Sequence, residues 1–381
     1  MNCCVKCFED VNVIEYIKSK RALGETCNYC GTKAELMVDI SDLSEMFSRL
    51  FKYYKVTTEF EHFDPEDQVA ADVGKSLWEW VQDSWNIFSE LTDERLLYDI
   101  VNLNRDSQID ESTLFSDPTD SIMYDRKGGM WESLSYNLKY ENRYFPKKNI
   151  DVYYTHEELL GELESLFKSI TTIVNTENIF YRARIGNFTD SKQLNAPPEE
   201  KILKGGRVNP IGIRVLYSAI DIETAIAEVR PWKSAPITIA CVRPKESLKL
   251  VDLSKISNRK AQILSSFFAT EDLYSELDTL DLLSTLDKTL SEPVHPESSE
   301  LEYIPSQYLT EFIKSLGYDG VIFKSSLGPG ENYAFFEWDK FSYKPSKLDV
   351  IIIDYYEVND MKYEFTSKLE AFMHSTLYNT I

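Results

Sequence analysis

Five of the six cysteines lie within the first thirty residues, a concentration that indicates metal chemistry. Cys4 and Cys7 form one Cys-x2-Cys pair, and Cys27 and Cys30 form a second. Two such pairs can place four thiolates tetrahedrally around Zn²⁺. We predict a structural zinc site, because a catalytic zinc keeps an open position and commonly has a His or carboxylate ligand. Free or redox-active thiols are the alternative, and Cys3 could replace Cys4 as a ligand.

A turn rich in glycine is the second feature with chemical potential. Gly205 and Gly206 precede Arg207 and Asn209, shortly before an apolar run that favours a strand. Such a turn can bring backbone amides and a guanidinium to an anion, although an ordinary surface turn would have the same composition. The other glycine pair, in Lys127–Gly129, lacks both the spacing and the Ser/Thr of a P-loop.

These residues belong to a longer succession of short motifs in a fixed order. The motifs are Tyr181-Arg182-Ala183-Arg184, Gly205-Gly206-Arg207-Val208-Asn209-Pro210, Leu216-Tyr217-Ser218-Ala219 with the helical pattern at 221–230, Tyr308-x2-Glu311-Phe312-Ile313, and the run from Gly317 to Ser326. This succession resembles the RES domain, a family named for its Arg, Glu and Ser residues. The resemblance covers about residues 178 to 345. The N-terminal half is similar to the extension that accompanies some RES domains.

The resemblance implies an ADP-ribosyltransferase-like fold that consumes NAD⁺. Family members act as NAD⁺ glycohydrolases or phosphorylases that release nicotinamide, so hydrolase or glycosyltransferase chemistry is expected. They are typically toxins of toxin–antitoxin pairs, and some instead ADP-ribosylate a protein. A bacterial toxin or antiphage-defence role, an inhibitory or antitoxin partner and a homo-oligomer are therefore expected as well.

The resemblance also assigns roles to individual residues. The catalytic positions that it implies are Arg182, Tyr217, Glu228 and Ser325. The positions implied to bind NAD⁺ are Arg182, Arg207, Asn209, Tyr217 and Ser325. Arg184 competes with Arg182 as the arginine that binds the pyrophosphate. Ser326 competes with Ser325, because the choice between them depends on the register of the strand.

Elementary chemistry agrees with these roles. An arginine such as Arg182 or Arg207 can bind a pyrophosphate bidentately. A carboxylate can stabilise the oxocarbenium-like ribosyl cation that forms when nicotinamide leaves. Glu228 lies at the edge of the apolar face of its helix and so can face a cleft, but a solvated helix carboxylate is the plainer interpretation. Tyr217 could stack on a base of NAD⁺, or it could be a half-buried strand residue.

The elements that must position these residues form a multidomain α+β chain. Apolar residues at spacings of three and four predict helices in the first half, including one over 157–174. Short β-prone runs begin near residue 178, among them Val215–Ala219 and Pro236–Val242, and helical patterns intervene at 222–230, 257–290 and 307–316. The acidic insertion at 271–302 is expected to be a surface excursion. A strand at 350–353 and a helix near 365–377 are expected to follow. The predicted domains are a Cys4 zinc-knuckle module at 1–40, a mainly helical domain at 41–175, a RES-like catalytic domain with a mixed β-core at 176–345, and a C-terminal strand and helix at 346–381.

Composition narrows the function classes. The 381 residues carry 41 Lys+Arg against 63 Asp+Glu, a formal net charge of −22. This balance opposes nucleic-acid binding, which needs a basic face, and opposes a polybasic membrane surface. No apolar run reaches the length of a membrane span, and the N-terminus lacks the apolar stretch of a signal peptide, so a cytoplasmic protein is expected.

Three functions remain open at this stage. The first is an NAD⁺-degrading effector whose N-terminal half senses a signal or restrains the active site. The second is a protein ADP-ribosyltransferase. The third is a non-enzymatic, zinc-containing interaction protein with a RES-like fold, against which the presence of Arg182, Tyr217, Glu228 and Ser325 counts.

Overall fold

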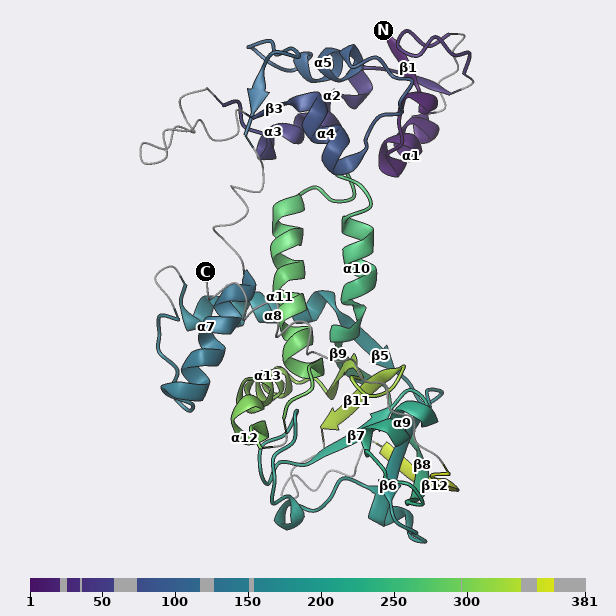
Figure 1. Cartoon of the computed structure of the whole chain (residues 1–381), viewed down its shortest axis with the longest axis vertical. Coiled ribbons are helices and arrows are strands. Elements are labelled where there is room, and N and C mark those ends of the chain that lie inside the picture. Colours follow the sequence, from purple (N-terminus) through teal and green to yellow (C-terminus); the bar gives the residue numbers. More distant parts are fainter. Residues whose placement is uncertain are drawn as a thin grey trace, which may run out of the picture. The chain divides into compact units, whose positions relative to one another are not determined.

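The chain divides into two compact units (Figure 1). The structure is a computed structural model, and it describes residues 1–20, 26–34, 36–57, 74–116, 127–150, 154–295, 297–336 and 348–359. Unit 1 comprises Met1–Ile170 with Leu253–Thr289, and unit 2 comprises Thr171–Asp252 with Leu290–Ile381. Residues 253–289, which the sequence places inside a domain at 176–345, thus group with the N-terminal half. No helix in the described ranges is long and apolar enough to cross a membrane.

The first part of unit 1 is mostly helical. Its elements are β1 (Asn2–Cys4), α1 (Val11–Lys20), β2 (Met37–Asp39), α2 (Ser41–Ser48), α3 (Leu50–Tyr53), β3 (Lys75–Ser76), α4 (Leu77–Trp85), α5 (Arg95–Asn102) and β4 (Leu114–Phe115). Strand β1 pairs with β2, and β3 pairs with β4. A capping box between Ser76 and Glu79 starts α4, which ends at Asn86 in the left-handed conformation (φ 47°).

The remaining helices of unit 1 are α7 (Lys127–Tyr140), α8 (His156–Ser169), α10 (Ile256–Ile263) and most of α11 (Leu273–Ser291). The glycine pair considered above lies in the first turn of α7. The Gly128 amide donates a hydrogen bond of 3.0 Å to Asp281 of α11, and a Cβ at Gly128 would collide with that carboxylate. Gly128 therefore permits close packing of two helices, in agreement with the absence of a P-loop.

Two expectations from the sequence are wrong at the level of elements. The helix expected over 157–174 ends at Ser169, because the β-branched run Thr171–Val174 forms strand β5 instead. The surface excursion expected at 271–302 is largely helix α11, whose leucines Leu280, Leu282, Leu283, Leu286 and Leu290 are buried. The acidic residues between these leucines made the segment look solvated in the sequence.

An eight-stranded mixed sheet forms the centre of the described part of unit 2. Besides β5, its strands are β6 (Phe180–Ile185), β7 (Val215–Ala219), β8 (Pro236–Pro244), β9 (Leu248–Asp252), β10 (Gly320–Lys324), β11 (Glu331–Phe336) and β12 (Leu348–Glu357). The strand order is β12-β8-β6-β7-β11-β10-β9-β5. Neighbouring strands are antiparallel except for β9 and β10, which are parallel. The helix expected near 365–377 lies outside the described residues.

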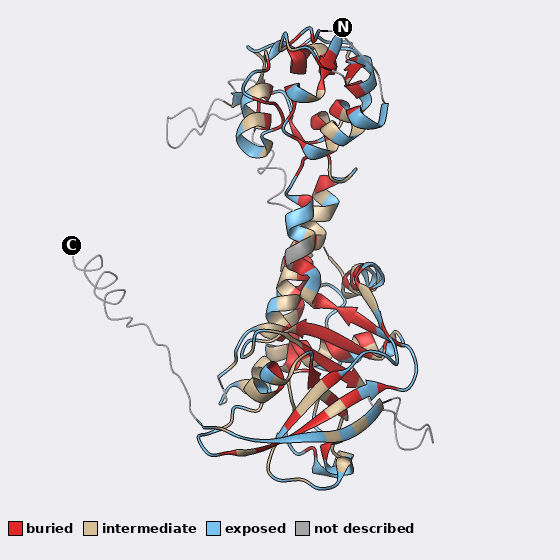
Figure 2. Ribbon diagram, turned by 90° about the vertical axis from the view of Figure 1, so that its right-hand side faces the viewer, coloured by how far each residue is buried: buried red, intermediate tan, exposed pale blue. Residues whose placement is uncertain are grey.

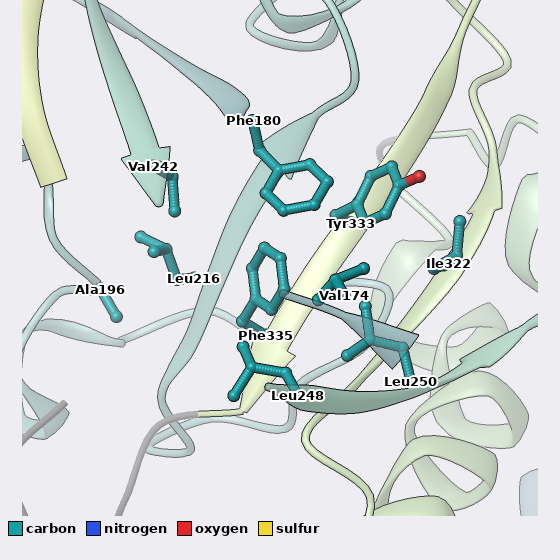
Figure 3. Close-up of a cluster of buried hydrophobic side chains, with 10 residues drawn as sticks. All are labelled: Val174, Phe180, Ala196, Leu216, Val242, Leu248, Leu250, Ile322, Tyr333 and Phe335. Atoms are coloured by element: carbon teal, nitrogen blue, oxygen red, sulfur yellow. The ribbon is translucent and has the colours of Figure 1, made fainter. Parts of the chain in front are cut away.

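Alternation along the strands separates two apolar clusters, and buried residues follow the strands of this sheet (Figure 2). Phe180 of β6 packs with Tyr333 and Phe335 of β11 in one cluster, which Figure 3 shows together with Leu216, Leu250 and their neighbours. Ala183 of β6 belongs to the other cluster, against which the apolar side of α9 (Ile222–Glu228) packs. Unit 2 also contains α12 (Ser299–Glu302) and α13 (Ile304–Ser315).

Candidate active site

A pocket of about 540 Å³ lies within unit 2, where the motifs of the RES-like succession meet. Its walls come from β6, β7, β10 and β11, from the C-terminal end of α9, from the turn at Gly206–Arg207 and from Tyr303. The last turn of α11 completes it through Leu290 and Ser291. The volume falls within the range of about 300–1,000 Å³ that is usual for small-molecule and cofactor sites.

Arg182 of β6 is a half-buried cation in this wall. One guanidinium nitrogen donates a hydrogen bond of 2.7 Å to the carbonyl oxygen of Tyr217, and the buried Nε has no hydrogen-bond partner among the described residues. Burial, with the nearby charge of Arg184 in second place, lowers the pKa of Arg182 to about 10. A buried guanidinium without a carboxylate partner is a strong place for an anion.

Arg184, the competing arginine, lines the same pocket in a different setting. Its side chain is exposed, donates to the carbonyl of Gln193 and lies over the ring of Phe188 at 4.6 Å. These partners satisfy Arg184 within the chain, which makes Arg182 the stronger candidate for an anion-binding group.

Tyr217 and the glycine turn hold each other. The Tyr217 hydroxyl donates to Oδ1 of Asn209 at 2.6 Å and accepts the amide of Val208 at 3.2 Å. Burial raises the pKa of Tyr217, so it stays a neutral donor. A Cβ on Gly206 would lie 2.5 Å from that hydroxyl, which is why this position needs glycine. The geometry makes the half-buried Tyr217 and the buried Asn209 a polar support for the turn.

Helix α13 fixes the same turn from the other side. The side chains of Ser306, Gln307 and Thr310 donate to the carbonyl oxygens of Arg207 (2.6 Å), Gly206 (2.9 Å) and Val208 (3.0 Å), respectively. The guanidinium of Arg207 donates to the carbonyl of Leu290 and lies 5.6 Å from the centre of the Tyr303 ring. Arg207 is thereby presented on a rigid backbone at the pocket wall.

Glu228, the last residue of α9, is the carboxylate of the pocket. The helix starts at an Asp221 cap, whose carboxylate accepts the amide of Thr224 at 2.7 Å. Oε1 of Glu228 accepts two hydrogen bonds, from the Ser325 hydroxyl at 2.6 Å and from the Asn332 amide nitrogen at 2.7 Å. Glu223 of the same helix is exposed and does not line the pocket.

The loop after β10 distinguishes the two candidate serines. The Ser325 oxygen accepts the backbone amides of Leu327 (3.1 Å) and Gly328 (2.8 Å) while its proton goes to Glu228. Ser326 lines the pocket itself and is exposed. The geometry therefore gives Ser325 contact with the carboxylate and gives Ser326 access to the cavity.

The charge of the pocket is opposite to that of the chain. Its lining holds one carboxylate, Glu228, and five cationic side chains, namely Arg182, Arg184, Arg207, Arg230 and Lys324. In a protein with a formal net charge of −22, this local excess of positive charge marks an anion-binding site.

Most of the residues singled out in the sequence come together here. Arg182, Arg207, Tyr217 and Glu228 line the pocket directly. Asn209 and Ser325 do not line the pocket but are hydrogen-bonded to residues that do. Asn209 accepts from Tyr217, and Ser325 donates to Glu228. The residues missed from the sequence are Asn332, Arg230 and Lys324. Asn332 had one available signal, since asparagine is depleted in strands and this one lies within an aromatic strand run.

The cysteine cluster is a separate candidate site in unit 1. Ligand atoms of Cys4, Cys7, Cys27 and Cys30 all lie within 4.8 Å of one another. The Sγ–Sγ separations are 4.0 Å for Cys4–Cys7, 3.6 Å for Cys4–Cys30 and 3.4 Å for Cys7–Cys27. Tetrahedral zinc with bonds of about 2.3 Å would hold its sulfurs about 3.8 Å apart, so the set fits Zn²⁺. Cys3, adjacent to Cys4 on β1, is not in the cluster.

Fold and site together define an α+β domain that is built on a mixed sheet. Its pocket is cationic and is lined by one carboxylate among the described residues. The model of the RES domain matches residues 179–350 of this chain. A chain in the crystal structure of the M. tuberculosis MbcT–MbcA toxin–antitoxin complex is similar at 13% identity, with a TM-score of 0.31. That match covers 51% of this chain and 91% of the other. No curated protein is a significant match.

Proposed function

We propose that the RES domain of this chain cleaves the bond between nicotinamide and ribose in NAD⁺, on an ADP-ribosyltransferase-like core. The observation that carries the proposal is the pocket with five cations and one carboxylate, at the positions where the family motifs lie. NAD⁺ requires these two kinds of group, cations for its pyrophosphate and a carboxylate beside the ribose that becomes cationic.

The proposed roles follow from the geometry of each group. Arg182 and Arg207 bind the pyrophosphate, since the guanidinium of Arg182 has an unpartnered Nε and Arg207 stands on a clamped turn. Tyr217 lines the pocket and supports the turn through Asn209. Glu228 stabilises the ribosyl cation, and Ser325 holds Glu228.

The reaction balances without a redox partner. The C1′–N bond breaks, and its electron pair goes to the nicotinamide nitrogen, which loses its positive charge. An acceptor oxygen forms a new C1′–O bond and releases its proton. With water the product is ADP-ribose, and with phosphate it is ADP-ribose 1″-phosphate. Both acceptors belong to the proposal.

A protein acceptor is the second candidate. Trp232, which is 60% exposed, follows the pocket residue Arg230 by two positions, and an exposed tryptophan beside a pocket is suited to contact a polypeptide. Such an acceptor would make the chain a protein ADP-ribosyltransferase.

Product analysis separates these activities. We would incubate the full chain with NAD⁺, with and without phosphate, and identify products by mass spectrometry. Free ADP-ribose supports hydrolysis, ADP-ribose 1″-phosphate supports phosphorolysis, and a mass increase of protein supports transfer. Intact NAD⁺ under all conditions, from a chain that binds it, would contradict the proposal.

A toxin or defence role restrained by an inhibitory partner is the accompanying proposal. Expression of the wild-type chain in a bacterial host is expected to deplete NAD⁺ and stop growth, while Glu228→Gln leaves both normal. Growth arrest at normal NAD⁺ levels would contradict this proposal. A homo-oligomer remains part of it, testable by the mass of the chain in solution.

A further inference from the structure

The carboxylate of Glu228 has two unequal oxygens. Oε1 accepts hydrogen bonds from Ser325 at 2.6 Å and from Asn332 at 2.7 Å. Oε2 accepts no hydrogen bond from the part of the chain that the structure describes. Because Glu228 is exposed overall while Asn332 is only 7% exposed, the bonded side of the carboxylate faces the protein and the other side is open.

Asn332 is held more rigidly than the glutamate that it contacts. It lies in β11, where its backbone is paired with Ala219 of β7 on one side and with Phe323 of β10 on the other. Its side chain is therefore anchored in the middle of the sheet, whereas Glu228 ends a seven-residue helix. The sheet fixes the position of Asn332, and the carboxylate of Glu228 takes its orientation from the hydrogen bond to Asn332.

The hydroxyl proton of Ser325 also has a fixed acceptor, Oε1 of Glu228. Its oxygen already accepts two backbone amides, so its single hydroxyl proton is available only as a donor to Oε1. Two donors on the same oxygen restrict the side-chain rotamers of Glu228, because both must be broken before the carboxylate can turn.

We propose that Asn332 is a positioning residue, which together with Ser325 fixes Oε1 of Glu228 and leaves Oε2 as the oxygen that meets the substrate ribose. The part about the substrate rests on the proposed function. An amide suits this position better than a carboxylate, since it offers a proton to Glu228 without adding like charge.

The test replaces the amide by a carboxylate in Asn332→Asp. Two carboxylates would then face each other at hydrogen-bond distance, and raising the pH to 8 would ionise both. The other charged groups lining the pocket are Arg182 and Arg184 of β6, Arg207 of the glycine turn, Arg230 after α9, and Lys324 of β10. These cations are the same in every variant compared.

Thermal stability tests the contact between Asn332 and Glu228 independently of catalysis. At pH 8 we expect Asn332→Asp to lower the Tm by about 3 °C or more, and we expect Glu228→Gln, added to it, to restore most of that loss. Asn178→Asp makes the same change in an exposed loop outside the pocket, and adding Glu228→Gln there should give no such recovery. An equal effect of Glu228→Gln in both backgrounds would overturn the proposal.

Kinetics test the positioning role. Asn332→Leu, which has no donor, should lower kcat about tenfold with KM changed less than about twofold. Asn332→Asp should add an alkaline limb to the kcat profile, because loss of the proton shared by the two carboxylates removes the donor to Oε1 and adds a like charge beside it. Unchanged kcat and profile in an active enzyme would overturn the positioning role. A wild-type chain that releases no nicotinamide would instead refute the proposed function, and the stability cycle would still decide the contact.

Discussion

Arg182 is the side chain whose surroundings say most about the ligand. Among the described residues, its guanidinium has a carbonyl but no carboxylate as a partner, and its buried Nε has no partner at all. Removing a cation from water has a cost that a bound anion offsets. The burial of Nε is a property of the folded strand, so the sequence alone kept Arg184 as a competitor of Arg182.

We predict that Arg182→Ala weakens NAD⁺ binding by about 10- to 100-fold, the size of a lost charge-assisted hydrogen bond. Calorimetric titration would measure this in the Glu228→Gln background, where NAD⁺ is not consumed. Arg184→Ala is expected to have a smaller effect, because the chain already satisfies Arg184. Equal losses for both variants would show that the two arginines share the anion.

At the residue scale, the order of the motifs pointed to residues that lie together in the structure, but it gave no sign of a contact across the sheet. Arg207, Tyr217 and Glu228 were found through the order of the motifs, and they line one pocket. Asn332 could not be found in this way. Its link to Glu228 spans 104 positions and depends on the packing of α9 against β11.

At the scale of elements, the strands were readable because β-prone runs are short and bounded by turn residues. The run Val215–Ala219 is strand β7 with the same bounds, and the run that begins at Pro236 is β8. The helical pattern at 257–290 anticipated helix α11, but not its burial, because its leucines alternate with acidic residues. Its contribution of Leu290 and Ser291 to the pocket could not be derived from the pattern either.

The glycine turn and α13 give a prediction at this scale. Gly206→Ala places a Cβ 2.5 Å from the Tyr217 hydroxyl, so the turn must shift, and we expect lower stability and loss of NAD⁺ binding. Gly161→Ala, at an exposed position of helix α8 with open space at its Cβ, is the matched control and should stabilise by about 0.5–1 kcal/mol. Denaturant unfolding of both variants measures the difference. A Gly206→Ala chain as stable as wild type would refute the packing role of this glycine.

At the scale of the whole molecule, the chain consists of two units that the sequence divides only approximately. The change from helical to strand-like patterns near residue 178 lies close to the observed boundary at Ile170 and Thr171. The return of residues 253–289 to unit 1 is a long-range feature, and local periodicity carries no information about it. The finer division into a zinc-knuckle module, a helical domain and a C-terminal segment stays a prediction.

The zinc proposal also belongs to this scale, since the cysteines lie in unit 1 and the pocket lies in unit 2. We expect about one zinc per purified chain by elemental analysis. Chelation or Cys27→Ser should lower the melting temperature of unit 1, because the metal ties together segments that are far apart in sequence. Cys241→Ser is the control, as that cysteine is outside the cluster. A metal-free chain that melts like the untreated protein would contradict the zinc site.

If the negative charge of Glu228 drives NAD⁺ cleavage, the rate of nicotinamide release should depend on that charge. We would compare this rate for wild type, Glu228→Gln and Glu223→Gln. The glutamine at 228 keeps the size of the side chain and removes the charge that stabilises the ribosyl cation. We predict that Glu228→Gln lowers the rate by about 10²-fold or more, while NAD⁺ binding is retained through Arg182 and Arg207. Glu223→Gln removes an exposed carboxylate of the same helix, outside the pocket, and should leave the rate unchanged. Equal rates for wild type and Glu228→Gln, or equal losses in both variants, would contradict the account.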